Sequence, residues 1–344
     1  MIYPSVVTAP QSTSPVNEQL SRAERLLELV APKLVLVEEE LRRNFESHIR
    51  TISDVGDHIL AGGGKRLRPA LLLLASRLLR YEGKRDVVYG AVVEFIHNAT
   101  LVHDDIIDEA EVRRGRTSIN YRWGNNLTVL VGDYIFMHSM SIALTDGSLD
   151  ILRLLSSVTI RMIEGEILGL EHNGRADLTI DDYFEIVHRK TAALFGACCR
   201  IPTHLVDVPD SQARALQEYG TNLGICFQLI DDLLDFTSST EILGKPALSD
   251  LKEGKVTLPL ILAMPRATDR EREIITRVAA LKSFDGIDPA EIGAIVRRYD
   301  ALDETRAIAR DYASRAKAAL EAFPRSDARE AMDQALDFVL ERDR

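Results

Sequence analysis

Two clusters of aspartates share the spacing DDxxD and are the residues best suited to chemistry. They are Asp104, Asp105 and Asp108 in the first cluster and Asp231, Asp232 and Asp235 in the second. Carboxylate oxygens without interleaved His or Cys favour magnesium or manganese over zinc. Magnesium is commonly held by a few carboxylates together with substrate phosphates. The residue types therefore predict metal-assisted chemistry on a phosphorylated substrate.

Helical spacing would place each cluster on one face of a helix, at about 100° per residue. The first face would carry Val93, His97, Thr100, Asp104 and Asp108, with Asp105 beside it. The second would carry Gly224, Gln228, Asp231 and Asp235, with Asp232 beside it. Like charges one turn apart repel by roughly 1 kcal/mol in water and about 4 at an effective dielectric near 20. Six buried carboxylates therefore require counter-charge, which three divalent cations would supply.

A single DDxxD would be interpreted as a solvated helix end. Asp181 and Asp182 illustrate that alternative, because Thr179 precedes them with the spacing of a capping box at a helix N-terminus. The two DDxxD clusters instead follow uncharged, mostly apolar stretches at residues 95–102 and 223–230. They lie 127 residues apart, from 104 to 231, which predicts two helices that face one another across a cavity.

Basic residues could hold the phosphates. Residues 62–69, GGGKRLRP, form a turn followed by three cations and a proline suited to a first helical turn. The alternative is a solvated loop, because the spacing differs from that of a nucleotide-binding P-loop. Arg113 and Arg114 begin five residues after Asp108, close enough to bind phosphate oxygens beside a metal. His97 is interpreted as functional, although a lone histidine on an apolar helix is more often a core residue.

Composition narrows the classes of protein. A net charge of −11 argues against a nucleic-acid partner. Three cysteines, two of them adjacent, predict neither a disulfide framework nor a zinc site, and a reducing cytoplasm fits best. The first residues lack the pattern of a signal peptide, so residues 1–20 are predicted to be a disordered tail. The longest apolar run, 69–75, is too short to span a bilayer, while contact with a membrane surface stays compatible with the sequence.

Apolar residues recur at helical spacing almost throughout the chain, and no strand alternation is evident. One such stripe comprises Leu26, Leu27, Val30, Leu34 and Val37. Residues 21–344 are therefore predicted to form one all-α domain of about a dozen helices. The C-terminal third, from about Arg266, is rich in charge and alanine and is assigned to packing helices.

Taken together, the motifs closely resemble those of the trans-polyprenyl diphosphate synthases. They are GGGKRLRP, LVHDDIIDEAEVRRG, the KT pair at Lys190 and Thr191, and FQLIDDLLDF followed by GK at Gly244 and Lys245. The resemblance extends from about Leu26 to the C-terminus. It implies antiparallel helices around a deep central cavity, and a homodimer.

The resemblance also implies a role for each motif residue. Three aspartates would ligate about three magnesium ions, or manganese: Asp104, Asp108 and Asp231. The other three would support them directly or through water: Asp105, Asp232 and Asp235. The allylic diphosphate would be held by Arg113, Lys190, Thr191, Gln228 and Lys245. Isopentenyl diphosphate would be bound by Lys65, Arg68, His97 and Arg114. Lys255 would help to close the site over the allylic diphosphate.

The implied reaction is a prenyl transfer in which departing pyrophosphate leaves an allylic cation. The double bond of isopentenyl diphosphate attacks that cation, and a proton is then lost. Such chemistry depends on electrostatic stabilisation and on exclusion of water rather than on a protein nucleophile. The product would be an all-trans polyprenyl diphosphate, with quinone side chains as its expected use.

The length of the product depends on side chains near the first cluster. Ala99 and Thr100 precede Asp104 by five and four residues, about 6 to 7.5 Å along a helix axis. Short-chain relatives typically carry an aromatic residue at this level, so the small residues here predict a long product, octaprenyl to decaprenyl. Phe136 or Met137 would form the floor of the product cavity, although both could equally be ordinary core residues.

Other functions are less compatible with the motifs. A geranylgeranyl or other shorter-chain synthase is the principal alternative. A terpene cyclase would not need the second DDxxD or the cations of residues 65–68. A non-catalytic subunit of a heteromeric synthase should have lost a cluster or the arginine pair. A calcium-binding protein would carry loop-spaced ligands around a central glycine.

Overall fold

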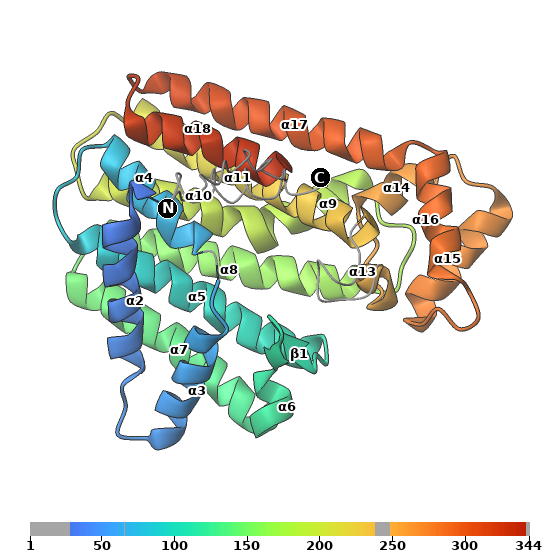
Figure 1. Ribbon diagram of the computed structural model, residues 1–344, viewed down its shortest axis with the longest axis horizontal. Coiled ribbons are helices and arrows are strands. Elements are labelled where there is room, and N and C mark those ends of the chain that lie inside the picture. Colours follow the sequence, from blue (N-terminus) through green and yellow to red (C-terminus); the bar gives the residue numbers. More distant parts are fainter. Residues whose placement is uncertain (1–27, 65, 238–247, 342–344) are drawn as a thin grey trace, which may run out of the picture.

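The computed structural model describes residues 28–64, 66–237 and 248–341. Over these residues the protein is almost entirely helical, and Figure 1 shows the long helices stacked with their axes roughly aligned. The predicted all-α class is therefore confirmed. The predicted disordered tail, residues 1–20, lies outside the described residues, as do Lys65 and Lys245.

The N-terminal half contains α2 (Ala31–Phe45), α3 (Arg50–Ala61), α4 (Leu67–Leu78), α5 (Arg85–Ile107), α6 (Ile119–Trp123), α7 (Asn125–Asp146) and α8 (Leu149–His172). The middle contains α9 (Ile180–Val187), η1 (His188–Ala192), α10 (Ala193–Arg200), η2 (Ile201–His204) and α11 (Asp210–Thr237). After residue 247 come α13 (Ser249–Lys252), α14 (Leu258–Ala263), α15 (Asp269–Leu281), α16 (Pro289–Arg298), α17 (Ala301–Ala319), η3 (Leu320–Ala322) and α18 (Asp327–Leu340).

Helices α5 and α11 form the centre of the molecule. α5 packs against α2, α4 and α7, while α11 packs against α10, α17 and α18. Most residues of α5 are buried on more than one side, as expected for a helix that is apolar around most of its circumference. Of the C-terminal helices, α14, α17 and α18 pack on α11, while α15 and α16 pack on α13, α14 and α17; none of them carries a cluster of site residues, as the sequence indicated.

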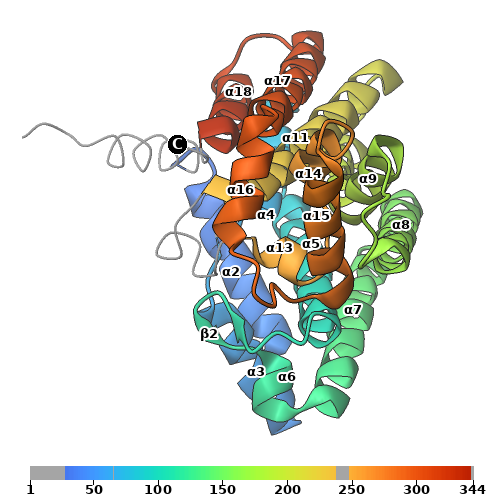
Figure 2. The ribbon, with the colours of Figure 1, turned by 90° about the vertical axis from the view of Figure 1, so that its right-hand side faces the viewer.

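A short antiparallel hairpin follows α5 and was not predicted. It pairs β1 (Val112–Arg113) with β2 (Arg116–Thr117). Its two loop residues, Arg114 and Gly115, have φ angles of 52° and 72°, the left-handed conformation of both central positions in a type I′ turn. The hairpin lies beside α3 and α6 in both views (Figures 1 and 2). Strands of two residues are too short to produce an alternating pattern in the sequence.

Helix α7 is unusual because it is apolar but poorly covered. Its most apolar stretch has a mean hydropathy of 1.5 and is 33% buried, so by length and composition alone α7 could cross a membrane. The run at residues 69–75, which guided the sequence analysis, lies in α4 and is buried. One side of α7 packs on α5, α6 and α8 through residues such as Val131 and Ile135. On the other side, Leu130, Met137 and Leu144 are each more than 60% exposed.

Two capping boxes define where helices begin. Thr179 accepts a hydrogen bond from the Asp182 backbone while the Asp182 side chain accepts one from the Thr179 backbone. Thr268 and Glu271 form the same arrangement at the start of α15. The interpretation of Asp181 and Asp182 as a helix N-terminus is therefore confirmed, which sets this acidic pair apart from the DDxxD clusters.

Candidate active site

One large cavity, which we call the central cavity, has a volume of about 990 Å³. Its wall is built from the start of α4, the second half of α5, α8, η1, α11 and α13. The predicted site residues along it are Arg68, His97, Thr100, Asp104, Asp108, Arg113, Arg114, Lys190, Thr191, Gln228, Asp231 and Lys255. The fold therefore brings together residues that are up to 187 positions apart, from 68 to 255.

Three of the six cluster aspartates line the central cavity. They are Asp104 and Asp108 at the end of α5 and Asp231 near the end of α11. The C-terminal end of a helix is the negative end of its macrodipole, so each carboxylate there costs roughly 0.3–1 kcal/mol. Asp104 is largely buried, and this burial raises its pKa to about 6 although the charge of Lys190 opposes the shift. Acidic residues kept at such positions indicate a bound cation.

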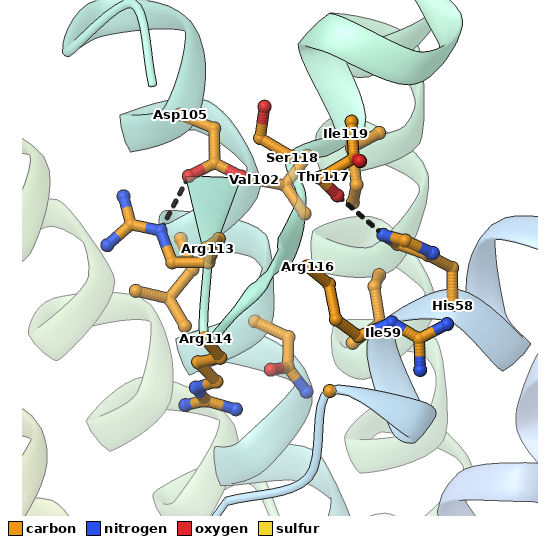
Figure 3. Close-up of a pocket in the computed structure, with 13 residues that line it drawn as sticks. His58, Ile59, Val102, Asp105, Arg113, Arg114, Arg116, Thr117, Ser118 and Ile119 are labelled. Carbon is orange, nitrogen blue, oxygen red and sulfur yellow. Dashed lines mark hydrogen bonds and ion pairs between the residues drawn. The ribbon is translucent and has the colours of Figure 1, made fainter. Parts of the chain in front are cut away.

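The other three aspartates are buried and do not line the central cavity. Asp105, Asp232 and Asp235 are only 3%, 2% and 6% exposed. Asp105 accepts a hydrogen bond of 2.6 Å from Nε of Arg113. Figure 3 shows this pair beside a small pocket between α3 and the hairpin, where His58 also contacts the backbone oxygen of Thr117. Asp105 thereby positions Arg113, whose side chain also lines the central cavity.

Asp232 belongs to a chain of hydrogen bonds that joins three elements. It accepts from the Tyr183 hydroxyl at 2.5 Å and from Nε2 of Gln228 at 2.9 Å. Thr191 in turn donates to Oε1 of Gln228 at 2.9 Å. Burial raises the pKa of Asp232 to about 7 although both of its donors oppose the shift. Tyr183 is a residue that the sequence analysis missed.

Asp235 binds the backbone at the start of α13, just after residues 238–247, which lie outside the described residues. Its carboxylate accepts hydrogen bonds from the backbone and hydroxyl of Ser249, at 3.0 and 2.9 Å, and from the backbone of Asp250 at 3.3 Å. The motif implied support of the metals directly or through water, and that role stays a prediction. Asp235 positions α13, and α13 carries Asp250 to the wall of the central cavity.

The donor set fits a divalent cation completed by substrate. Among the described residues, no three His, Cys, Asp or Glu side chains converge closely enough to hold an ion by themselves. Magnesium is usually bound by one or two carboxylates with phosphate and water as its other ligands. Asp104, Asp108 and Asp231 offer that incomplete oxygen set on two walls of one cavity.

Near the start of α4 the cavity is lined by Arg68, His97 and Arg114, which we call the cationic region. Nε of Arg68 is buried and has no hydrogen-bond partner among the described residues, and the guanidinium lies 4.6 Å from the centre of the Phe195 ring. Burial, followed by the charges of Arg68 and Arg114, holds the pKa of His97 well below its usual value. A buried guanidinium donor without an acceptor is costly, so this group of residues fits an anion.

Arg66 and Glu94 are a buried pair that the sequence analysis did not assign. They are 8% and 3% exposed, and Nη1 of Arg66 lies 2.8 Å from the Glu94 carboxylate. Arg66 also binds Glu38 of α2. Its backbone is left-handed, with φ of 46°. The pair therefore fixes Arg66 at the start of α4, and the nearby Gly63 oxygen accepts a hydrogen bond of 2.5 Å from Arg114.

Lys190 and Thr191 lie in η1, a π-helical turn between α9 and α10. Such turns are frequent at functional sites. Lys190 forms an ion pair with Glu166 of α8, another cavity residue that the sequence analysis missed. Gly165 allows the two elements to approach, because a Cβ there would lie 2.6 Å from the Lys190 backbone nitrogen.

Lys255 joins the two sides of the cavity. Its ammonium group lies 2.9 Å from Asp108 and 2.8 Å from Glu253. The Lys255 ammonium group thus acts as a counter-ion for the first aspartate cluster. Neither Glu253 nor Asp250 was singled out from the sequence, although both line the cavity.

The residues predicted to set product length are only partly in place. Thr100 lines the central cavity, with its hydroxyl bonded at 2.7 Å to the His97 backbone oxygen. Ala99 is buried in the core instead. Neither Phe136 nor Met137 lines the central cavity, because Phe136 packs against the core and Met137 is 63% exposed. Their role as the floor of the product cavity stays a prediction.

The apolar wall is supplied by α8 and neighbouring helices. Its members are Leu101, Ile107, Met162, Ile163, Ile167, Leu170 and Phe227. The helices surround one cavity. It has carboxylates on two walls, cations at one end that form no ion pair with the described residues, and an apolar wall between them. Such a cavity suits an amphiphilic phosphorylated substrate. These features define the protein as an enzyme of the helical isoprenoid synthase class.

Comparison with known proteins gives the family. The polyprenyl synthetase family matches residues 49–291. Octaprenyl diphosphate synthase of Escherichia coli (strain K12) is 37% identical over 322 residues, which are 93% of this chain and 99% of that protein. The chain belongs to the polyprenyl synthetase family, and the predicted prenyltransferase is confirmed.

Solved structures agree with this assignment. A decaprenyl diphosphate synthase from Rhodobacter capsulatus has a TM-score of 0.89 at 36% identity, covering 94% of this chain and 99% of that one. A polyprenyl synthase from Caulobacter crescentus CB15, complexed with calcium and isoprenyl diphosphate, has a TM-score of 0.89 at 37% identity, covering 93% and 98%. The solved structures of the family thus include one that contains both a divalent cation and an isoprenyl diphosphate.

Proposed function

We propose that this enzyme condenses isopentenyl diphosphate with an allylic diphosphate to make a long all-trans polyprenyl diphosphate, from octaprenyl to decaprenyl. The observation that carries the proposal is the central cavity itself. It joins Asp104, Asp108 and Asp231 to the unpaired Arg68 through an apolar wall. Two phosphorylated substrates and one hydrocarbon chain would together occupy the aspartates, the cationic region and the apolar wall.

Magnesium, with manganese as a substitute, would be held by Asp104, Asp108 and Asp231. We propose about three ions per site, since the cavity also contains Asp250, whose pKa burial and the neighbouring Asp235 raise well above its usual value. When bound, the metal stabilises the negative charge that develops on the departing pyrophosphate. The chain's own contribution is to bind the allylic diphosphate through Arg113 and Lys190.

Isopentenyl diphosphate would occupy the cationic region. Arg68 and Arg114 would donate hydrogen bonds to its phosphate oxygens, and His97, neutral in its buried position, would donate one more. Lys65 is expected to contribute as well, outside the described residues. This arrangement keeps the second substrate apart from the metals and directs its double bond towards the first.

A long product is supported by the small Thr100 on the cavity wall and by the octaprenyl and decaprenyl synthases among the relatives. A short-chain isoprenyl diphosphate synthase of Methanothermobacter thermautotrophicus is also 35% identical over 85% of this chain. Product length is therefore the part of the proposal that most requires measurement.

We also propose a homodimer of this chain in the cytoplasm. The exposed apolar side chains of α7 continue on α8 with Ile160, which is 55% exposed. A second copy would cover this face, and the buried thiols of the cysteines suit a reducing compartment. Light scattering should give twice the chain mass, and Leu130→Glu should give the monomer; a monomeric native protein would contradict the proposal.

The activity is tested by incubation with isopentenyl diphosphate, magnesium and one primer at a time: geranyl, farnesyl or geranylgeranyl diphosphate. Mass spectrometry of the products should show chains of eight to ten prenyl units. Asp104→Asn should abolish elongation, whereas Asp181→Asn, which alters an exposed acidic pair at the start of α9, should not. No elongation with any primer would refute the function, and arrest at geranylgeranyl would refute the long product.

A further inference from the structure

The hairpin of β1 and β2 is held in place by hydrogen bonds rather than by core packing. Val112 is 55% exposed, and none of the strand residues is buried. Two strands of two residues are not stable by themselves. A small cavity of about 50 Å³ lies between the hairpin, α3 and α5, so side chains do not fill this space completely. The position of the hairpin therefore depends on a few polar contacts.

Each strand of the hairpin is joined to a different helix. In β1, Nε of Arg113 donates to Asp105 of α5 at 2.6 Å. In β2, the backbone oxygen of Thr117 lies 2.8 Å from Nε2 of His58 in α3. Figure 3 shows these two contacts on opposite sides of the hairpin. Arg114, in the turn between the strands, is therefore positioned from both sides.

The contact with Thr117 requires the hydrogen of the His58 imidazole to be on Nε2. Nη1 of Arg122 lies 3.1 Å from Nδ1 of the same ring. A guanidinium can only donate, so Nδ1 accepts this hydrogen bond and Nε2 carries the hydrogen that is donated to Thr117. Trp123 packs edge-to-face on the imidazole, with ring centres 5.2 Å apart, and the Arg122 guanidinium lies 4.4 Å from the centre of the Trp123 ring. Two residues of α6 thus hold the orientation of His58.

His58 lies near the end of α3 that leads towards the cationic region. Gly63, two residues after the end of α3, accepts a hydrogen bond of 2.5 Å from Arg114. Arg114 lines both the small cavity and the central cavity. Helix α3 and the turn after it thus contact the hairpin at two places. Loss of the His58 contact would weaken this restraint on Arg114, whereas Arg113 would keep its bond to Asp105.

We propose that His58 is a positioning residue for isopentenyl diphosphate, and that it acts through the hairpin by holding Arg114 in the cationic region. The inference rests on the proposed function, in which Arg114 binds that substrate and Arg113 binds the allylic diphosphate. His58 itself touches no substrate, because it lines the small cavity and not the central one. Its loss should therefore weaken the binding of one substrate and not of the other.

Substitutions of His58 separate its hydrogen bonds from its bulk. His58→Leu keeps a similar volume and removes both hydrogen bonds. His58→Gln can place an amide nitrogen near the position of Nε2, and its amide oxygen can accept from Arg122. His58→Asn is polar, but its amide is too short to reach Thr117. Asp57→Ala is the matched control, at an exposed position next to His58 on α3.

The experiment measures KM for each substrate with the full-length enzyme and magnesium. Incorporation of labelled isopentenyl diphosphate is followed at saturating farnesyl diphosphate, and the reverse titration gives KM for farnesyl diphosphate. His58→Leu and His58→Asn should raise KM for isopentenyl diphosphate by about tenfold, which is the effect of a lost hydrogen bond. KM for farnesyl diphosphate should change by less than about twofold. His58→Gln and Asp57→Ala should resemble the native enzyme for both substrates.

A double-mutant cycle tests whether the effect passes through Arg114. Arg114→Leu alone should raise KM for isopentenyl diphosphate, because it removes a phosphate-binding group. In that background His58→Leu should add less than about twofold, since the residue that it positions is gone. A further rise of about tenfold would show that His58 does not act through Arg114, and it would overturn the inference.

Other results would also overturn it: unchanged KM values in His58→Leu, an equal rise in KM for both substrates, or no rescue by His58→Gln. Circular dichroism establishes that each variant folds, and His58→Asn decides if His58→Leu does not. Absence of elongation by the native enzyme would instead refute the proposed function, so the two failures are distinguishable.

Discussion

The two aspartate clusters have the same spacing at the ends of two long helices, yet they differ in how their side chains are used. In the first cluster two carboxylates, Asp104 and Asp108, line the central cavity. In the second cluster only Asp231 does so. Asp232 and Asp235 instead bind Tyr183 and the start of α13. A shared motif therefore guarantees a shared helical face but not a shared environment.

The comparison predicts its largest effect for the aspartates that line the cavity. Asp104→Asn and Asp231→Asn should each lower kcat/KM by about 100- to 1,000-fold, because each removes charge that stabilises the transition state. The thermal unfolding temperature of the metal-free protein should not fall. Steady-state kinetics and calorimetry measure the two quantities. If a variant loses stability together with activity, its aspartate has a structural role instead.

Asp235→Ala should behave in the opposite way. It leaves the Ser249 and Asp250 backbone groups without their acceptor, which should lower the free energy of unfolding by about 1–3 kcal/mol. Urea denaturation measures this loss. Activity should fall less than in Asp231→Asn. Unchanged stability would show that the carboxylate does not hold α13.

Tyr183→Phe tests whether the hydrogen-bond chain around Asp232 acts on the metals. Loss of the hydroxyl should raise the magnesium concentration needed for half-maximal activity by about tenfold, since partners of metal-binding groups commonly contribute that much. Tyr312→Phe, a conservative change in α17, is the control. An unaltered magnesium requirement with lower stability would assign Tyr183 a purely structural role.

The pH dependence of the unfolding temperature should differ between the native protein and Asp104→Asn. Asp104 has a pKa of about 6 in the folded protein against 3.8 ordinarily, so the folded state binds its proton more tightly. Without metal, this contribution to stability is present below about pH 4 and is lost as pH rises towards 6. Asp104→Asn should therefore match the native unfolding temperature near pH 4 and exceed it at pH 8. Magnesium together with pyrophosphate at pH 8 should stabilise the native protein more than it stabilises Asp104→Asn.

The smallest effect is expected for the acidic pair at the start of α9. Asp182→Asn weakens a capping box and should cost about 1 kcal/mol of stability, with no change in kcat/KM. Denaturation and steady-state assays test both parts. A tenfold loss of activity would show that this pair, like the DDxxD clusters, contributes to the site.

Much of the site could be predicted because its residues are close in sequence. The spacing in α5 placed Asp104, Thr100 and His97 along one stripe, and all three line the cavity. Tyr183 and Glu166 were missed because each acts on a partner far away in the chain or on another helix. The sequence could not show that Met137 is exposed, because a bulky apolar residue on a helix has the same pattern whether it faces a cavity or the surface.

The sequence by itself determined the helical class and the two acidic helix ends, because periodicity and residue type are local properties. It also predicted a need for cations, since buried carboxylates require counter-charge or hydrogen-bond donors. Only the tertiary structure decided which aspartates line the cavity and that Asp235 holds α13. Burial and hydrogen-bond partners depend on side chains from distant segments, and these meet only in the folded protein.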